Sequence, residues 1–110
     1  MSQFDFIQRF TIENSPVRGE IVRLKDSFRQ VLDKHDYPAA IEKQLGEMLS
    51  AVALLTAIVK VDGILSLQAR GAGPCSLLMA ESNPGGDLRA IARYEGDVGE
   101  ASTLKELVGN

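Results

Sequence analysis

The sequence predicts an α+β domain in which an antiparallel sheet packs against one long central helix. The longest apolar stretch of the chain, residues 38–60, has helical spacing over its first half. Two segments with strand patterns precede it and three follow it. A short helical pattern stands just before the central stretch, and another closes the chain. The expected order of elements is therefore β-β-α-α-β-β-β-α.

The central stretch is amphipathic in its first half and almost wholly apolar in its second. One helical face of the first half carries Ile41, Leu45, Met48, Leu49 and Val52, and the other carries Glu42, Lys43, Gln44 and Glu47. Between residues 51 and 59 only Thr56 is polar, so this half is expected to have protein on nearly every side. Pro38 suits the first helical position, and Lys60 before Asp62-Gly63 suits the end.

Size and composition indicate one soluble globular domain, residues 1–110. The uninterrupted apolar run is less than half of the ~20 residues that a membrane span needs, so no membrane partner is expected. A net charge of -3 argues mildly against a nucleic-acid surface. The N-terminus lacks an apolar secretory signal, which favours the cytoplasm. A single cysteine can form no internal disulfide.

The first two strands are expected to form a hairpin. Apolar residues of the first strand fall on alternate positions, which is the period of a half-buried strand. They are Phe4, Phe6, Phe10 and Ile12. Residues 14–16 indicate a turn, and residues 17–24 form the returning strand. Gly19 inside that strand predicts a bulge or a close backbone approach.

A short helix should connect the hairpin to the central helix. Ser27 and Gln30 have capping-box spacing at its start. It should end near His35-Asp36, because the residue before Pro38 is pushed away from helical angles.

The rest of the chain is expected to form a three-stranded meander and a short helix. Its strands and turns are residues 65–70, 71–74, 76–81, 82–86 and 88–94. An acidic loop follows at residues 97–100. Thr103 and Glu106 then form a capping box, and Gly109 fits the C-terminal cap.

Cys75 and His35 are the residues that a small thiol enzyme would use. Cys75 stands at a strand start beside Pro74, with no basic residue or histidine adjacent in sequence to activate it. A small packed side chain is the favoured interpretation. His35 is the only histidine, whereas a metal site needs several donors. The enzyme alternative stays open but is not favoured.

Other candidate groups are weaker. Arg70, Arg89 and Arg93 lie on the polar alternation of their strands and could gather on one face to bind an anion, although solvated surface charges are favoured. The glycine-rich segment 71–74 resembles a phosphate loop but lacks a following helix and a Gly-Lys-Ser/Thr, so it is a turn. Two carboxylate pairs lack any partner acid, base or ligand set: Asp5 with Glu13, and Asp97 with Glu100. No catalytic, cofactor-binding or metal-binding residue is assigned.

Several short motifs, in order along nearly the whole chain, resemble one family closely. They are VRGE (17–20), HDYP (35–38), LLTA (54–57) ahead of KVDG (60–63), GAGP (71–74) after Gln68, RAIAR (89–93) and LKELVGN (104–110). Each motif alone is weak, but their shared order and spacing make the match specific. The chain resembles the N-terminal part of the bacterial redox-regulated heat-shock chaperones of thirty-three kilodaltons.

The resemblance implies a cytoplasmic chaperone of the stress response, a holdase that binds unfolded proteins under oxidative stress without ATP and is not an enzyme. In that family, four cysteines of a C-terminal module bind zinc when reduced, and their oxidation to disulfides exposes client-binding surface. Cys75 corresponds to none of these cysteines, and the sequence stops at Asn110, before them. No cofactor is therefore expected in this segment.

The resemblance also implies that strands beyond Asn110 would complete the sheet. Without them, an open sheet edge and part of the long helix should be uncovered. The expected consequence is self-association to a dimer, by edge pairing or by exchange of an element between copies.

Overall fold

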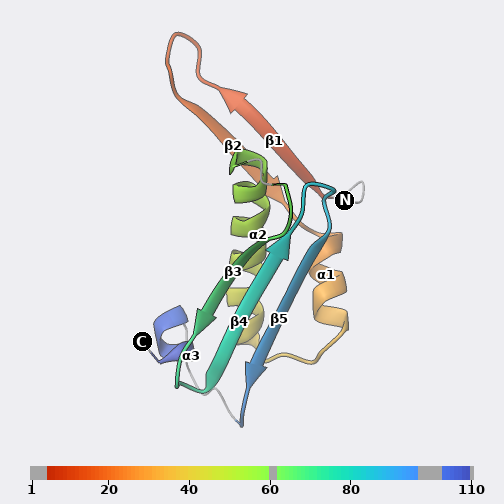
Figure 1. Ribbon diagram of the computed structural model, residues 1–110, viewed down its shortest axis with the longest axis vertical. Helices are drawn as coiled ribbons and strands as arrows, with labels where there is room; N and C mark the ends of the chain where they lie inside the picture. The colour runs from red at the N-terminus through yellow and green to blue at the C-terminus, as the bar shows by residue number, and fades with distance from the viewer. Residues whose placement is uncertain (1–4, 60–61, 97–102, 110) are drawn as a thin grey trace.

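The computed structural model describes residues 5–59, 62–96 and 103–109. The elements in chain order are β1 (Phe6–Thr11), β2 (Arg18–Arg23), α1 (Asp26–Asp33), α2 (Ala39–Val59), β3 (Leu65–Arg70), β4 (Cys75–Ser82), β5 (Leu88–Tyr94) and α3 (Leu104–Val108). This is the predicted order, and the α+β fold class is confirmed. The molecule is elongated, with extents of 50 × 27 × 25 Å, and the β1–β2 hairpin projects from one end (Figure 1).

The strands form two separate sheets instead of the single sheet that was expected. β1 and β2 make a two-stranded antiparallel ribbon, and β3, β4 and β5 make an antiparallel meander in that order. The meander is confirmed with its predicted boundaries nearly unchanged. The hairpin does not join it, because β1 and β2 pair only with each other among the described residues. The hairpin instead lies beside the C-terminal half of α2 (Figure 1).

The first half of α2 packs across one face of the meander as predicted. Ile41, Leu45 and Leu49 are fully buried and join the two clusters of the core. Gln44, placed on the polar face by the sequence pattern, is also buried. The helix begins at Ala39, and the carbonyl of Pro38 accepts the first backbone hydrogen bonds of the helix. Pro38 therefore precedes the first helical residue instead of occupying it.

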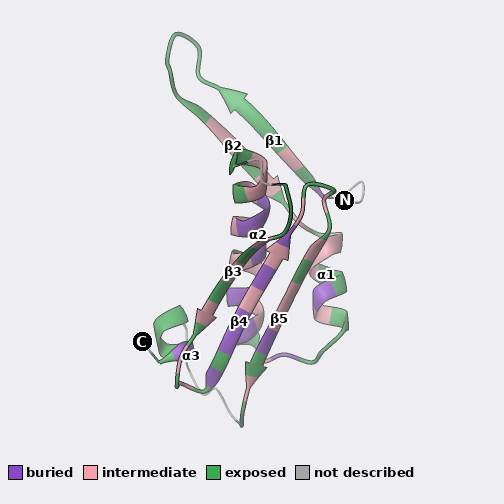
Figure 2. Cartoon of the chain, in the orientation of Figure 1, coloured by how far each residue is buried: buried purple, intermediate pink, exposed green. Residues whose placement is uncertain are grey.

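The second half of α2 is less covered than its apolar sequence predicts. Leu55, Ile58 and Val59 are 36%, 56% and 54% exposed. The expectation of burial on nearly every side is therefore wrong for the last turns (Figure 2). The meander covers the first half of the helix and reaches Val52 at the start of the second, whereas the hairpin lies beside the last turns. The alternative expectation, that part of the helix is uncovered, is confirmed. Lys60 lies outside the described residues.

The N-terminus of α1 is capped by Asp5, which precedes β1 and lies at the same end of the hairpin. The predicted capping box at Ser27 does not form, because the helix begins at Asp26 and its N-cap is Lys25, two residues before Ser27. The carboxylate of Asp5 accepts the backbone N–H groups of Lys25, Asp26 and Ser27 at 2.7, 2.9 and 3.0 Å, together with the Ser27 hydroxyl. The helix ends at Asp33, slightly before the expected end near His35-Asp36.

The short helix α3 confirms its predicted caps. The side chain of Thr103 accepts the Glu106 N–H at 3.1 Å, and Gly109 adopts the left-handed conformation with φ +79°. The N–H of Gly73 donates to the Val108 carbonyl at 2.9 Å. This bond docks α3 against the turn between β3 and β4 and helps to bury Leu107 in the core. The predicted acidic loop, residues 97–100, lies outside the described residues.

Candidate functional site

The β1–β2 hairpin is regular along its whole length. Phe6 pairs with Arg23 and Thr11 with Arg18, and the ladder extends to a hydrogen bond between the Ile12 N–H and the Val17 carbonyl at 3.2 Å. The register contains no bulge, so that interpretation of Gly19 is wrong. Because strand side chains alternate between faces, this register fixes which residues share each face of the hairpin.

One face of the hairpin is mainly apolar and uncovered, although Gln8 and Arg23 also lie on it. Its large side chains come from both strands and are 38% to 53% exposed. They are Phe6, Phe10, Ile12, Val17 and Ile21. We call these five residues the hairpin patch. The sequence pattern predicted a half-buried strand here. No described element covers this face, and its residues are exposed instead (Figure 2).

Phe10 explains why glycine occupies position 19. The two residues are cross-strand partners, and the Phe10 ring lies directly over the Gly19 backbone. A Cβ at Gly19 would lie 2.4 Å from the ring, closer than van der Waals contact allows. The close approach predicted from the sequence is therefore real, but a side chain makes it.

The opposite face of the hairpin turns toward α2. Arg9 and Glu20 pair across the strands with an Nε–Oε1 distance of 3.1 Å, and they line a cleft of about 370 Å³ with Ile58. This face therefore mixes polar and apolar residues, because Ile7 and Val22 also pair on it. The exposed end of α2 lies beside it, so apolar surface is present on two sides of the projecting arm.

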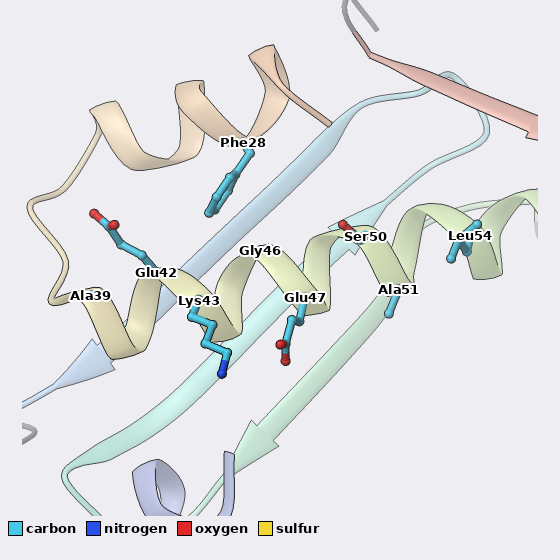
Figure 3. A pocket seen from close by; sticks show the side chains of 9 residues that line it. All are labelled: Phe28, Ala39, Glu42, Lys43, Gly46, Glu47, Ser50, Ala51 and Leu54. Atoms are coloured by element: carbon cyan, nitrogen blue, oxygen red, sulfur yellow. The ribbon is translucent and has the colours of Figure 1, made fainter. Parts of the chain in front are cut away.

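A shallow groove of about 760 Å³ runs along α2 where α1 packs against it. Phe28 reaches from α1 onto Gly46, and Glu42, Lys43 and Glu47 are also among the lining residues (Figure 3). The groove is mainly apolar and carries few converging polar groups. It does not resemble a site for chemistry on a small molecule.

Cys75 and His35 occupy different environments. Cys75 is fully buried in the core, and its thiol donates to the Leu77 carbonyl at 3.3 Å. Burial raises the pKa of the Cys75 thiol, which disfavours the reactive thiolate. His35 is exposed and packs beside Tyr37, with ring centroids 5.3 Å apart. The geometry therefore favours a packed cysteine over a nucleophile.

The register places the three arginines on one face of the meander, opposite α2. Arg70 and Arg93 both flank Leu77, and Arg89 lies farther along β5 beside Glu81. All three side chains are exposed. Sequence reasoning identified the shared face but not Glu81, whose carboxylate offsets part of the positive charge near Arg89.

The remaining candidate groups do not converge. Asp5 is used as the cap of α1, while Glu13 is exposed in the hairpin loop. Segment 71–74 is the turn that carries α3, and Asp97 and Glu100 lie outside the described residues. Within the described ranges, no three His, Cys, Asp or Glu side chains come together as a metal site would need. The described residues therefore do not fit zinc.

No helix in the described part of the chain is long and apolar enough to cross a membrane.

The described residues offer an exposed apolar arm and an uncovered helix end. A model of the Hsp33 protein family matches residues 5–110. The chain belongs to this family.

Curated relatives agree with the family. The chain is 42% identical over 110 residues to the 33 kDa chaperonin of Serratia proteamaculans. It is 44% identical over 111 residues to the 33 kDa chaperonins of Yersinia pestis and Yersinia pseudotuberculosis. Each alignment covers 100% of this chain and 38% of the relative. The chain therefore spans little more than a third of the length of these proteins.

The hairpin patch is the part of the site that sequence reasoning missed. The sequence predicts a strand that includes Val17 and Ile21, but this prediction does not pair them with the apolar residues of β1. A signal was available: the apolar positions of both strands fall on the same side once the turn is centred between residues 12 and 17. Only the structure shows that this side of the hairpin is exposed.

Proposed function

We propose that this chain is a client-binding part of an ATP-independent holdase, which retains unfolding proteins under oxidative stress. The observation that carries the proposal is the hairpin patch. Five large apolar side chains share one exposed face of a projecting arm, and exposed apolar patches of this kind mark surfaces that bind other proteins. Unfolding proteins expose apolar side chains, which this face can cover.

Other properties of the whole protein belong to the same proposal. Membership of the family and the names of the relatives support a chaperone that acts on unfolded clients in the cytoplasm. Zinc binding and redox control would reside in cysteines outside these residues, since Cys75 is buried and the described residues do not fit zinc. Dimer formation is likewise proposed, and the existence of residues 1–110 as one independent domain stays a prediction.

The direct test is protection of a heat-sensitive enzyme from aggregation. With the chain present at stoichiometric amounts and without ATP, we expect light scattering by the unfolding enzyme to be slowed severalfold. An equal mass of an unrelated globular protein serves as the control. If the chain slows scattering no more than the control, the proposal fails.

The anion-binding alternative has one geometric observation in its favour, the shared face of Arg70, Arg89 and Arg93. The same assay separates the two functions. Binding of clients by the apolar hairpin patch should persist as the salt concentration rises, whereas binding through three exposed arginines should weaken. If added salt abolishes the protection from aggregation, the binding site would be the arginine face and not the hairpin patch.

A further inference from the structure

The Arg9–Glu20 ion pair lies at the middle of the hairpin ladder, on the face turned toward α2. The Glu20 side chain is only 9% exposed, whereas that of Arg9 is 51% exposed. The second carboxylate oxygen of Glu20, Oε2, is buried, and no hydrogen-bond donor reaches it among the described residues. A buried carboxylate with an unpaired oxygen reduces stability, and an apolar pair at these positions would avoid that cost. Structural specificity therefore explains the ion pair better than stability does.

The apolar pattern of the hairpin does not by itself select the observed register. A slip of two residues keeps every side chain on its own face, because side chains alternate between faces with a period of two. In the observed register Phe10 lies opposite Gly19. After a slip of two residues in one direction, Phe10 would lie opposite Val17, and Phe6 opposite Ile21. The slipped hairpin would therefore still have directly opposed apolar side chains on the face of the hairpin patch.

Charge distinguishes the two registers. In the observed register Arg9 lies opposite Glu20, and Arg18 lies opposite Thr11. The same slip would place Arg9 opposite Arg18. Opposite charges directly across an antiparallel pair stabilise the pairing, whereas like charges destabilise it. The ion pair therefore favours the observed register, and the two arginines oppose the slipped one.

Two other features hold the ends of the hairpin. At the turn, the Ile12 N–H donates to the Val17 carbonyl at 3.2 Å, and Asn14 has a positive φ of 61°. At the base, the carboxylate of Asp5 holds the start of β1 against the start of α1. The ion pair is the charged contact between these two ends, and in the described residues it is the only ion pair of the hairpin.

We propose that Arg9 and Glu20 are positioning residues that set the register of the hairpin and thereby assemble the hairpin patch. The inference rests on the proposed function and adds the residues that arrange its binding surface. Both residues lie on the face opposite the hairpin patch. They act on it through the register, which decides that Phe10 lies over Gly19.

The variant Arg9→Glu tests the proposal because it reverses both charge contacts. Glu20 would repel the new acid at position 9, and Arg18 would attract it from the slipped register. The hairpin of this variant should therefore slip by two residues. A residue that merely stabilised the hairpin would loosen it without exchanging the pairs.

Nuclear magnetic resonance distinguishes the two registers directly. In the unchanged chain the Phe10 ring lies over Gly19, so its ring current should shift the signals of the Gly19 α protons. In Arg9→Glu this shift should be lost, and the contacts of the Phe10 ring should move from Gly19 to Val17. The rearranged patch should also slow the aggregation of a client severalfold less than the unchanged chain does.

Two further variants serve as rescue and control. In the exchange Arg9→Glu with Glu20→Arg, position 9 meets an arginine in either register, so the turn and Asp5 should restore the observed one. The Phe10–Gly19 contact should then return, even if Arg9→Glu alone leaves the strands unpaired. Arg23→Glu is the matched control, because it makes the same charge change opposite the uncharged Phe6 and should not alter the register.

The proposal is overturned if Arg9→Glu keeps the Phe10 ring over Gly19, if the exchange does not restore that contact, or if Arg23→Glu also slips. Full protection of a client by a slipped hairpin would reject the role of the register in the hairpin patch. These outcomes are distinguishable from failure of the proposed function. An unchanged chain that does not slow aggregation would reject the holdase and leave the register measurements standing.

Discussion

Replacing Asp5 by alanine is expected to destabilise the fold by roughly 2–3 kcal/mol at neutral pH, because hydrogen bonds to a charged group are worth more than neutral ones. The buried carboxylate accepts three backbone N–H groups and the Ser27 hydroxyl at the N-terminus of α1. These donors have no partner within the helix, so alanine leaves them unsatisfied. Asp5→Asn keeps one acceptor oxygen and should cost less.

The stabilisation by Asp5 should depend on pH in a defined direction. Burial by itself would raise the pKa of Asp5, but the hydrogen bonds from Ser27, Asp26 and Lys25 outweigh it and hold the pKa below its usual value. A carboxyl whose folded pKa is depressed contributes its full stabilisation above the unfolded pKa of about 3.9. That contribution is lost as the pH falls through the folded pKa.

Urea unfolding followed by circular dichroism measures both effects, since the chain contains no tryptophan. The free energy of unfolding of the unchanged chain should exceed that of Asp5→Asn at pH 7, and the difference should shrink below about pH 4. An equal difference at both pH values would show that the charge of Asp5 does not stabilise the helix end.

The substitution Gly71→Ala should undock α3 from the sheet. A Cβ at Gly71 would lie 1.8 Å from the Val108 carbonyl oxygen, a contact with backbone that cannot be relieved by a side-chain rotation. Moving α3 away would expose Leu107 and Val108, which are 0% and 6% exposed. At about 1.5–3 kcal/mol for each large apolar side chain, we expect a loss of roughly 3 kcal/mol or more.

Gly63→Ala is the matched control for Gly71→Ala, because a Cβ at Gly63 would meet no atom within 4 Å. Its free energy of unfolding should stay within about 0.5 kcal/mol of the unchanged chain. Both variants are compared by chemical denaturation. Equal stability of the two alanine variants would mean that the turn and α3 do not approach as closely as described.

The sequence predicted correctly those elements whose causes are local. The alternation of Leu65, Leu67 and Ala69 follows from one sheet face lying on a helix. The caps at Thr103 and Gly109 depend on neighbours within one turn. Such patterns can be read from a few consecutive residues, and the structure confirms them.

The predictions were wrong for features that depend on residues distant in the sequence. The N-terminus of α1 is capped by Asp5, twenty or more residues earlier, so the local pair Ser27 and Gln30 gave a misleading signal. Hydrophobicity likewise predicted burial for Ile58 and for Ile12. Burial depends on whether another element reaches those positions, and within the described residues none covers them.

For the site, residue type and spacing were informative about Cys75 and His35. The positions of Cys75 and His35 gave no reason to expect a catalytic pair, and the structure places one in the core and the other at the surface. The hairpin patch depended on the register between two strands. Family resemblance suggested a client-binding surface, but only the pairing of β1 with β2 indicated where we propose it to be.

The central claim is that the hairpin patch holds clients. The most direct measurement is the aggregation assay with Ile12→Thr and Ile21→Thr combined, since threonine keeps the strand propensity while removing apolar surface at two sites that are 51% and 53% exposed. Ile64→Thr is the control, because Ile64 is 67% exposed but lies outside the hairpin. The double variant is expected to lose most of its ability to slow aggregation, and the control is expected to lose little of it. Full protection by a folded double variant would contradict it.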